Sequence, residues 1–198
     1  MTLLPPFLNL KDRRVLLVGA GRVARDKLRA LAPTGCALRV VAKAIPEAFR
    51  WEARGLGVQW REGAFAPEDL EGAVLVIAAT NDPEANRAIA AAARALGVLV
   101  NAVDDPPACD AYFAATLRRG PLTLAVGTEG GFPGLARAVR RLLDALLPEG
   151  DAPLLQRLAQ ARRRARTFPD PAARKAALDP LLDAFEATYP GVIHDRLR

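Results

Sequence analysis

Apolar residues in the first half of the chain follow two alternating patterns. Short continuous apolar runs are typical of buried parallel strands, and stretches with apolar residues three or four positions apart are typical of helices. The predicted strands cover residues 15–18, 37–42, 57–60, 73–80 and 98–104. The predicted helices cover residues 22–35, 46–55 and 82–97, with a single helical turn at 67–72. Repeated β/α units of this kind predict an α/β fold with a doubly wound parallel sheet.

The pattern changes after Asp105. Two strand-like pieces, residues 111–117 and 122–126, flank the turn sequence "RRGP" and predict an antiparallel hairpin. From Pro133 onward the spacing is helical, and prolines at 148, 169 and 190 separate the segments. We therefore predict three regions, which are a nucleotide-binding domain over 1–112, a segment with the hairpin over 113–148, and a helical region over 149–198.

The sequence "GAGRVA" directly follows the first predicted strand and opens the first predicted helix. Gly19 permits a tight turn, Gly21 lets a pyrophosphate approach the backbone, and Ala24 lets the helix pack close to the strand. The N–H groups at the start of the helix then face the phosphates. This context favours dinucleotide binding over a glycine turn of purely structural use.

The second strand ends without the acidic residue that usually binds the ribose hydroxyls. Lys43 and Ala44 stand there instead, so the residues alone leave NAD and NADP open. The fourth strand ends in "AATND", which predicts Thr80 and Asn81 as neighbours of the cofactor or substrate. Helix capping ahead of the next helix is an equal alternative for Asn81 and Asp82.

Composition and charge narrow the class of protein. The chain has 198 residues, of which 51% are hydrophobic and 25% charged, which indicates a folded chain. The start of the chain lacks a signal-peptide pattern and no apolar run is long enough to span a membrane, so we expect a cytoplasmic protein. The net charge of +6 favours an anionic partner such as nucleic acid, an acidic surface or a small polyanion. The two cysteines, Cys36 and Cys109, lack the spacing of a metal or redox pair.

Four motifs in order carry a resemblance to a known family. They are "LPPFLNLKDRRVLLVGAGRVARDKLRAL", "VIAATNDPEANRAIAAAA", "VNAVDDP" and "RGPLTLAVGTEGGFPGLARAVRRLLDALLP". Over roughly residues 3–150 the chain resembles the precorrin-2 dehydrogenase family, which includes the N-terminal module of siroheme synthase and stand-alone bacterial enzymes. The resemblance implies a Rossmann-like domain, a dimerisation segment with swapped elements, a C-terminal helical region and a homodimer.

The resemblance also implies an activity, which is the NAD-dependent oxidation of precorrin-2 to sirohydrochlorin on the route to siroheme. Some members of the family also insert Fe²⁺ into the product. The implied substrate carries eight carboxylates, which gives the positive net charge a specific partner and removes the need for a nucleic-acid or membrane partner. The alternatives are another Rossmann-type oxidoreductase and a dinucleotide-sensing regulator whose basic helices bind nucleic acid.

The resemblance assigns roles to residues at matching positions. Asp104 matches the aspartate that the family uses in dehydrogenation and chelation, and a carboxylate at the end of a strand is suited to accept a proton. We expect Asp105 to shape the following turn. The expected cofactor-binding residues are Gly19, Ala20, Gly21, Arg22, Val23, Ala24, Lys43, Ala44, Thr80 and Asn81. The expected substrate-binding residues are Asn101, Arg118, Arg119 and Thr128, and the two arginines at the predicted hairpin turn are candidates because arginine can bind a carboxylate through two hydrogen bonds.

Some positions depart from the family or have a plain alternative. Glu129 and Phe132 replace a usual glycine and serine, which puts the function of that loop in doubt, and Ala114 stands where a proline is common. The arginines at 162, 163, 164 and 166 either bind carboxylates or form a solvated helix face. The single histidine, His194, lies near the end of the chain, so we predict no histidine metal site, and any iron would be held by the macrocycle.

Overall fold

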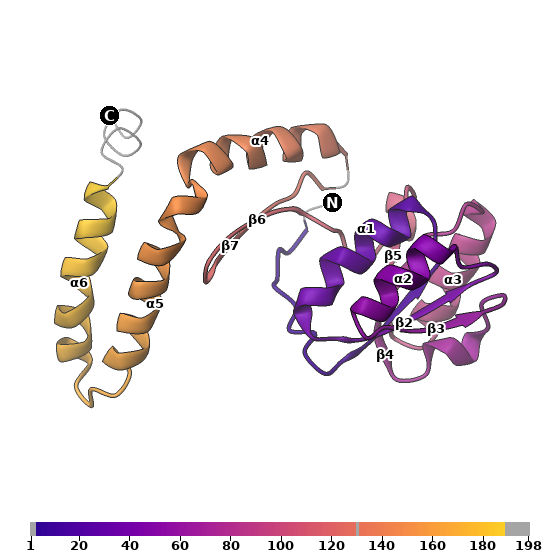
Figure 1. Ribbon diagram of the computed structural model, residues 1–198, viewed down its shortest axis with the longest axis horizontal. Coiled ribbons are helices and arrows are strands. Elements are labelled where there is room, and N and C mark those ends of the chain that lie inside the picture. Colours follow the sequence, from indigo (N-terminus) through magenta and orange to yellow (C-terminus); the bar gives the residue numbers. More distant parts are fainter. Residues whose placement is uncertain (1–2, 130, 189–198) are drawn as a thin grey trace. The chain divides into compact units, whose positions relative to one another are not determined.

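The protein is described by a computed structural model, which describes residues 3–129 and 131–188. The chain divides into two compact units between Phe113 and Ala114. Figure 1 shows the ribbon of both units coloured along the sequence. Each unit has its own sheet and helices, so each is described separately.

The first unit is built on a five-stranded sheet. Its strands are β1 (Arg14–Val18), β2 (Ala37–Ala42), β3 (Gln59–Glu62), β4 (Ala73–Ala78) and β5 (Leu99–Ala102). All pairings are parallel and the order is β3-β2-β1-β4-β5. The strand order therefore reverses between β1 and β4, which is where doubly wound sheets bind ligands, beyond the carboxyl ends of the strands. The predicted sheet is confirmed.

Helices cover both faces of this sheet (Figure 1). They are α1 (Arg22–Leu31), α2 (Glu47–Gly55) and α3 (Pro83–Ala95). Leu28 of α1 and Phe49 of α2 pack in one buried cluster with the side chains of β1, β2 and β4 that point to that face. Ile89 of α3 packs in a second cluster with the side chains that point the other way. Strand residues are apolar on both faces because both faces are covered.

Several predicted boundaries were wrong, for local physical reasons. The third strand lies at 59–62 rather than 57–60, because Gly57 adopts a φ of 66° and forms a turn. The last strand ends at Ala102 rather than Asp104, because Asp104 adopts a φ of 60°, which a strand does not allow. The fourth strand likewise ends at Ala78, two residues before the prediction.

The second unit contains an antiparallel hairpin of β6 (Ala115–Arg119) and β7 (Leu122–Val126). The first hairpin strand was predicted at 111–117. It begins later because the amides of Asp110 and Ala111 donate hydrogen bonds to the carbonyl of Val100, which holds them against β5. Arg118 and Arg119 lie in β6 and not in the turn, because they pair in register with Thr123 and Leu122 of β7.

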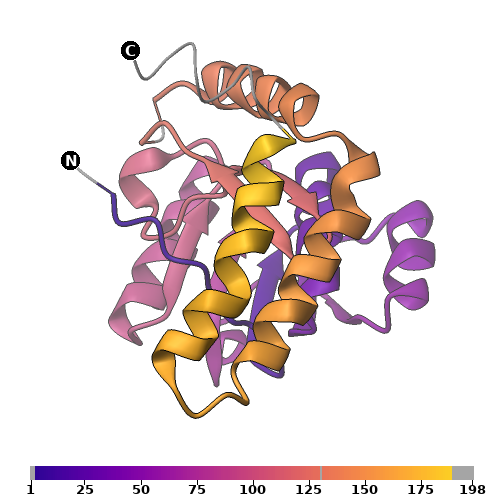
Figure 2. The same cartoon turned by 90° about the vertical axis from the view of Figure 1, so that its left-hand side faces the viewer.

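Three helices complete the second unit, and Figure 2 shows α5 and α6 side by side. They are α4 (Pro133–Leu146), α5 (Ala152–Ala165) and α6 (Pro171–Ala187). A short 3-10 helix at Glu149–Asp151 separates α4 from α5, directly after the predicted division at residue 148. Throughout the described ranges, no helix has the length and apolar character needed to cross a membrane.

Candidate functional site

The turn between β1 and α1 is held tightly at Gly19. Its φ is 118°, which side-chain-bearing residues rarely adopt, and a Cβ there would lie 2.3 Å from the carbonyl oxygen of Ala79. The amide of Gly19 donates to the carbonyl of Val41 at 2.8 Å, and the amide of Ala79 donates to that of Val18 at 2.8 Å. The turn is therefore wedged between the ends of β2 and β4.

Gly21, two residues later, has a different reason to be glycine. Its φ of −77° is open to any residue, and a Cβ there would meet no atom within 4 Å. It is the N-cap of α1, makes no side-chain cap and has no acidic residue in the first turn after it. The first helical hydrogen bond runs from the amide of Arg25 to the carbonyl of Gly21, so the three amides before Arg25 lie ahead of it.

These features form an open cradle of backbone N–H groups at the positive end of the helix dipole, which fits the pyrophosphate of a dinucleotide. Among the residues predicted to bind the cofactor here, Ala20 and Ala24 are buried, Arg22 is exposed and Val23 is half-buried. Ala24 lies in the same buried cluster as Val15 and Leu17 of β1, which brings α1 close to the strand.

At the end of β2, Lys43 and Ala44 are both exposed. The neighbouring strand contributes Glu62, which pairs in register with Ala42, the last residue of β2. The same oxygen of Glu62, Oε1, accepts hydrogen bonds from the amide of Ile45 at 3.3 Å and from the guanidinium of Arg50. Glu62 therefore ties down the loop after β2.

At the end of β4, Thr80 is held by a residue that the sequence reasoning missed. The Thr80 hydroxyl donates to Oδ1 of Asn86 at 2.7 Å, and the Asn86 amide donates back to the carbonyl of Thr80 at 3.2 Å. Asn86 is buried, at the face of α3 that also carries Ile89, Ala90 and Ala93. The sequence did contain a signal for the role of Asn86, which is a polar residue within the apolar stripe of a predicted helix.

For Asn81 and Asp82, the alternatives were contact with the cofactor or substrate and capping of the next helix. Asp82 caps α3, because its Oδ1 accepts hydrogen bonds from the amides of Glu84 at 3.0 Å and Ala85 at 3.2 Å. Asn81 is exposed at the edge of the sheet. The capping explanation thus holds for Asp82, and a cofactor contact of Asn81 stays a prediction.

After β5 the two adjacent aspartates differ in their surroundings. Asp104 is exposed with a φ of 60°, a left-handed conformation that Asp tolerates better than most residues. Asp105 is half-buried and forms an ion pair with Arg87 of α3 at 2.9 Å. The carbonyl of Asp105 accepts the amide of Ala108 at 3.0 Å, which is the turn role expected for it. Asp104 is thus the more accessible carboxylate.

Asn101 is positioned to hold this loop rather than to face solvent. It is 7% exposed, and its Nδ2 donates to the carbonyl of Ala111 at 2.8 Å. Its Oδ1 is buried and has no hydrogen-bond partner among the described residues. The Cys109 thiol donates to the carbonyl of Ala102 at 3.1 Å, and burial raises the pKa of this thiol. The segment that begins with Asp104 is therefore fastened to β5 by two side chains.

The remaining predicted substrate residues belong to the second unit. Arg118 is exposed on β6, whereas Arg119 is buried, pairs with Asp144 of α4 and donates to the carbonyl of Leu147. The Thr128 hydroxyl accepts the amide of Phe132 at 3.2 Å ahead of α4. Arg119 thus links the hairpin to α4. The four arginines at 162, 163, 164 and 166 are all exposed.

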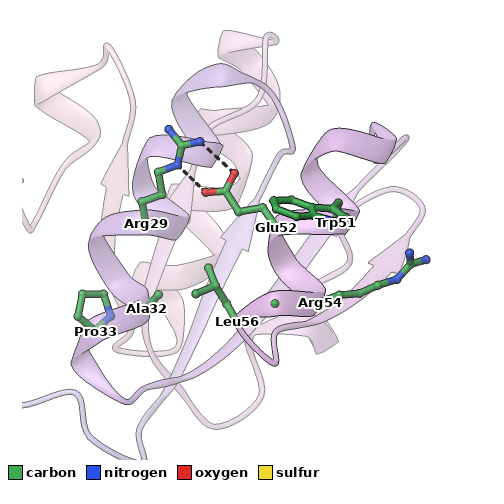
Figure 3. A pocket seen from close by; sticks show the side chains of 8 residues that line it. Arg29, Ala32, Pro33, Trp51, Glu52, Arg54 and Leu56 are labelled. Carbon is green, nitrogen blue, oxygen red and sulfur yellow. Dashed lines mark hydrogen bonds and ion pairs between the residues drawn. The ribbon is translucent and has the colours of Figure 1, made fainter.

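A hollow of the first unit lies between α1 and α2 (Figure 3). Arg29 and Glu52 in its wall are bonded to each other, and Trp51 stands beside them with 75% of its surface exposed. Arg54, the other charged residue of the lining, forms an ion pair with Glu47 at 3.5 Å, so the charged groups of this hollow are already paired, unlike the amides at Gly21.

In the part of the chain that the structure describes, candidate metal ligands do not cluster. No group of three or more His, Cys, Asp or Glu side chains there is arranged to hold a metal ion. His194 lies outside the described residues.

Residues 6–115 match a protein-family model described as NAD(P)-binding, which spans more than half of the chain. The chain belongs to this NAD(P)-binding family. The matched range of this NAD(P)-binding chain takes in the whole sheet of the first unit and the glycine turn, in agreement with the cradle at Gly21.

Similar proteins extend the comparison beyond this range. The siroheme synthase of Azotobacter vinelandii is 40% identical over 202 residues, which cover 100% of this chain and 41% of that protein. The siroheme synthase of Methylococcus capsulatus is 42% identical over 178 residues, which cover 88% of this chain and 37% of that protein. The chain thus spans about two fifths of the length of these relatives. The solved structure titled "SirC, precorrin-2 dehydrogenase" has a TM-score of 0.73 and 26% identity, and the match covers 96% of this chain and 93% of that one.

Proposed function

We propose that this chain is an NAD-dependent dehydrogenase that oxidises precorrin-2 to sirohydrochlorin in siroheme biosynthesis. The observation that carries the proposal is the likeness to the precorrin-2 dehydrogenase SirC, which extends over 96% of this chain and therefore beyond the nucleotide-binding unit. Relatives named siroheme synthase agree with it.

The site supports this chemistry in two places. The reaction removes a hydride and a proton from the macrocycle, and NAD, when bound, accepts the hydride. The open amides at Gly21 are suited to bind the pyrophosphate. We assign proton acceptance to Asp104, because it is exposed at the carboxyl edge of the sheet and free of the ion pair that occupies Asp105.

The predicted substrate residues fall into two groups, those that would contact the substrate directly and those that would position other segments. Arg118 is exposed and suited to bind a carboxylate directly. Asn101 and Arg119 are both 7% exposed and serve the substrate through the segments that they hold. A hydroxyl contact from Thr128 stays a prediction.

The assembly and the further activity are also proposals. We propose a homodimer through the second unit, which leaves apolar side chains of α4 such as Leu135 and Leu142 exposed. Insertion of Fe²⁺ into sirohydrochlorin and a cytoplasmic location stay predictions.

The function is tested by anaerobic incubation of the purified protein with precorrin-2 and NAD, following the visible spectrum of the tetrapyrrole together with NADH. We expect sirohydrochlorin and NADH to form in equal amounts. Formation of neither product rejects the proposal and leaves another Rossmann-type oxidoreductase as the alternative. A second incubation of sirohydrochlorin with Fe²⁺ measures chelation separately.

The role of Asp104 is tested with Asp104→Asn, which keeps the left-handed conformation accessible and removes the charge. We expect turnover to fall at least about 100-fold, as is typical when a general base is lost. NAD affinity should stay unchanged, because the carboxylate is not part of the cradle at Gly21. Full turnover in this variant would reject Asp104 as the base.

A further inference from the structure

Lys27 occupies an unusual position for a lysine. It lies on α1 between Ala24, Leu28 and Leu31, which are the buried residues of that helix, and it is half-buried itself. The chain that leaves β5 crosses to the same face, because Val103 and Ala111 pack against the cluster that contains Leu28. The side chain of Lys27 therefore lies on the face of α1 that meets the segment after β5, which carries Asp104 and Phe113.

The contacts of Lys27 leave its charge without a counter-ion. Its Nζ lies 3.8 Å from the centre of the Phe113 ring, and this cation–π contact fixes the end of the side chain. Among the described residues, no carboxylate lies within ion-pair distance of Nζ. Burial lowers the pKa of Lys27, while the nearby Cys109, Asp26 and Asp104 oppose that shift.

The other cations around this loop are already paired. Arg87 bonds to Asp105 at 2.9 Å, and Arg94 bonds to Asp110 at 3.1 Å. Of Lys27, Arg87 and Arg94, only Lys27 forms no ion pair with a carboxylate among the described residues. A half-buried ammonium without a close carboxylate is suited to bind an anion, and such groups gather at functional sites.

We propose that Lys27 binds one carboxylate of the tetrapyrrole substrate and so anchors the macrocycle beside Asp104. This inference rests on the proposed function, because it takes the eight-carboxylate macrocycle as the substrate. The ammonium donates hydrogen bonds to the carboxylate, and the Phe113 ring holds the ammonium in place for it. Lys27 is thus a binding residue that fixes the reacting carbon relative to the base, and it takes no proton in the reaction.

Three variants test the inference. Lys27→Met removes the charge and keeps an unbranched apolar stem on Phe113, whereas Lys27→Arg keeps the charge. Lys11→Met is the matched control, because it removes the same charge from an exposed position. Lys11 precedes β1 and so lies toward the amino ends of the parallel strands, whereas Asp104 follows the carboxyl end of β5. We expect Lys27→Met to raise the KM for precorrin-2 about tenfold or more. The KM for NAD should stay unchanged, and Lys27→Arg should recover most of the loss.

A second measurement needs neither turnover nor a substitution at Lys27. An eight-carboxylate porphyrin is titrated into the wild-type protein while the Nζ resonance of Lys27 is followed by nitrogen NMR across pH. A bound carboxylate favours the charged ammonium, so we expect the pKa of Lys27 to rise when the porphyrin binds. Binding is measured in the same titration from the porphyrin absorbance.

The outcomes separate this inference from the proposed function. Equal KM values in wild type and Lys27→Met, or porphyrin binding that leaves the Lys27 titration unmoved, overturn the role of Lys27 and leave the dehydrogenase intact. An equal rise of KM in Lys11→Met also overturns it, because the effect would then come from net charge. Absence of turnover by the wild type rejects the proposed function, while the porphyrin titration still tests the carboxylate site.

Discussion

In the first unit, four of the five strands carry apolar side chains that are completely buried. The second unit buries few apolar side chains. Val15, Leu16 and Leu17 of β1 are 0% exposed, as are Val40 and Val41 of β2. Among the described residues of the second unit, the buried apolar side chains are Leu117, Ala136, Leu155 and Ala165. Leu142 on α4 and Leu182 on α6 are more than half exposed there.

The two units therefore gain their stability in different ways. A parallel sheet with helices on both faces buries its apolar strands within one chain. A two-stranded hairpin is marginally stable by itself and needs further packing. In the second unit an ion pair between Arg119 of β6 and Asp144 of α4 links the hairpin to that helix. We infer that the first unit is self-sufficient and that the second gains stability by association.

The largest expected effect tests the self-sufficiency of the first unit. Gly19→Ala forces a side chain into the φ of 118° and against the carbonyl oxygen of Ala79. We expect a loss of about 3 kcal/mol or more in the free energy of unfolding of this unit. Urea unfolding followed by circular dichroism measures it.

Gly21→Ala is the matched control within the same turn, because a Cβ there meets no atom within 4 Å. We expect its unfolding free energy to stay within about 1 kcal/mol of wild type. Its Kd for NAD should rise about tenfold or more, since the methyl group projects into the phosphate cradle. Equal stability of the two variants would show that the close approach at Gly19 does not hold the unit together.

The sequence predicted the elements of the first unit better than those of the second. Residues 37–42 read as a strand because every position is apolar except Arg39, and β2 has those bounds. The third strand was predicted two residues too early, because β3 lies at the edge of the sheet and its sequence, Gln59 to Glu62, contains no apolar run. The start of β6 was predicted too early because residues 111–114 look apolar enough for a strand, whereas the amides of Asp110 and Ala111 are hydrogen-bonded to the carbonyl of Val100.

For the site, the sequence predicted the residues that belong to one short motif. It did not predict contacts between residues that are far apart in the chain. Gly19 and Gly21 belong to one short motif, although only the structure separates their roles. The pairing of Asn86 with Thr80 and the stacking of Lys27 on Phe113 depend on how α1, α3 and the loop after β5 meet. A polar residue within an apolar helical stripe marks both positions, but the stripe does not reveal its partner.

A smaller effect tests the dependence of the second unit on association. Leu142→Lys places a charge on α4 at a side chain that is 65% exposed in one chain. If a second copy covers this face, self-association should weaken at least about tenfold, which corresponds to about 1.4 kcal/mol. Sedimentation velocity over a concentration series measures it.

Leu96→Lys is the corresponding change in the first unit, at a leucine that is 59% exposed after α3. We expect it to leave self-association unchanged. A protein that stays monomeric at every concentration, or an equal effect of both substitutions, contradicts the inference that the second unit is the one that associates.

The smallest expected effect concerns acid stability of the first unit. Glu52 of α2 accepts hydrogen bonds from Arg29 and Arg25 of α1, and these bonds lower the pKa of Glu52 from 4.5 to about 2. Because the carboxylate is favoured in the folded state, its stabilising contribution is complete above pH 4.5 and is lost as the pH falls toward 2.

Glu52→Gln removes this contribution at every pH, so the melting temperatures of wild type and variant should differ above pH 4.5 and converge as the pH approaches 2. Glu68→Gln, at an exposed position of the same unit, should show no such convergence. The difference should be small, since Arg25 and Arg29 are 39% and 54% exposed and solvent screens the pairs. A constant difference down to pH 2 would mean that the Glu52 side chain links α1 to α2 through packing rather than through its charge.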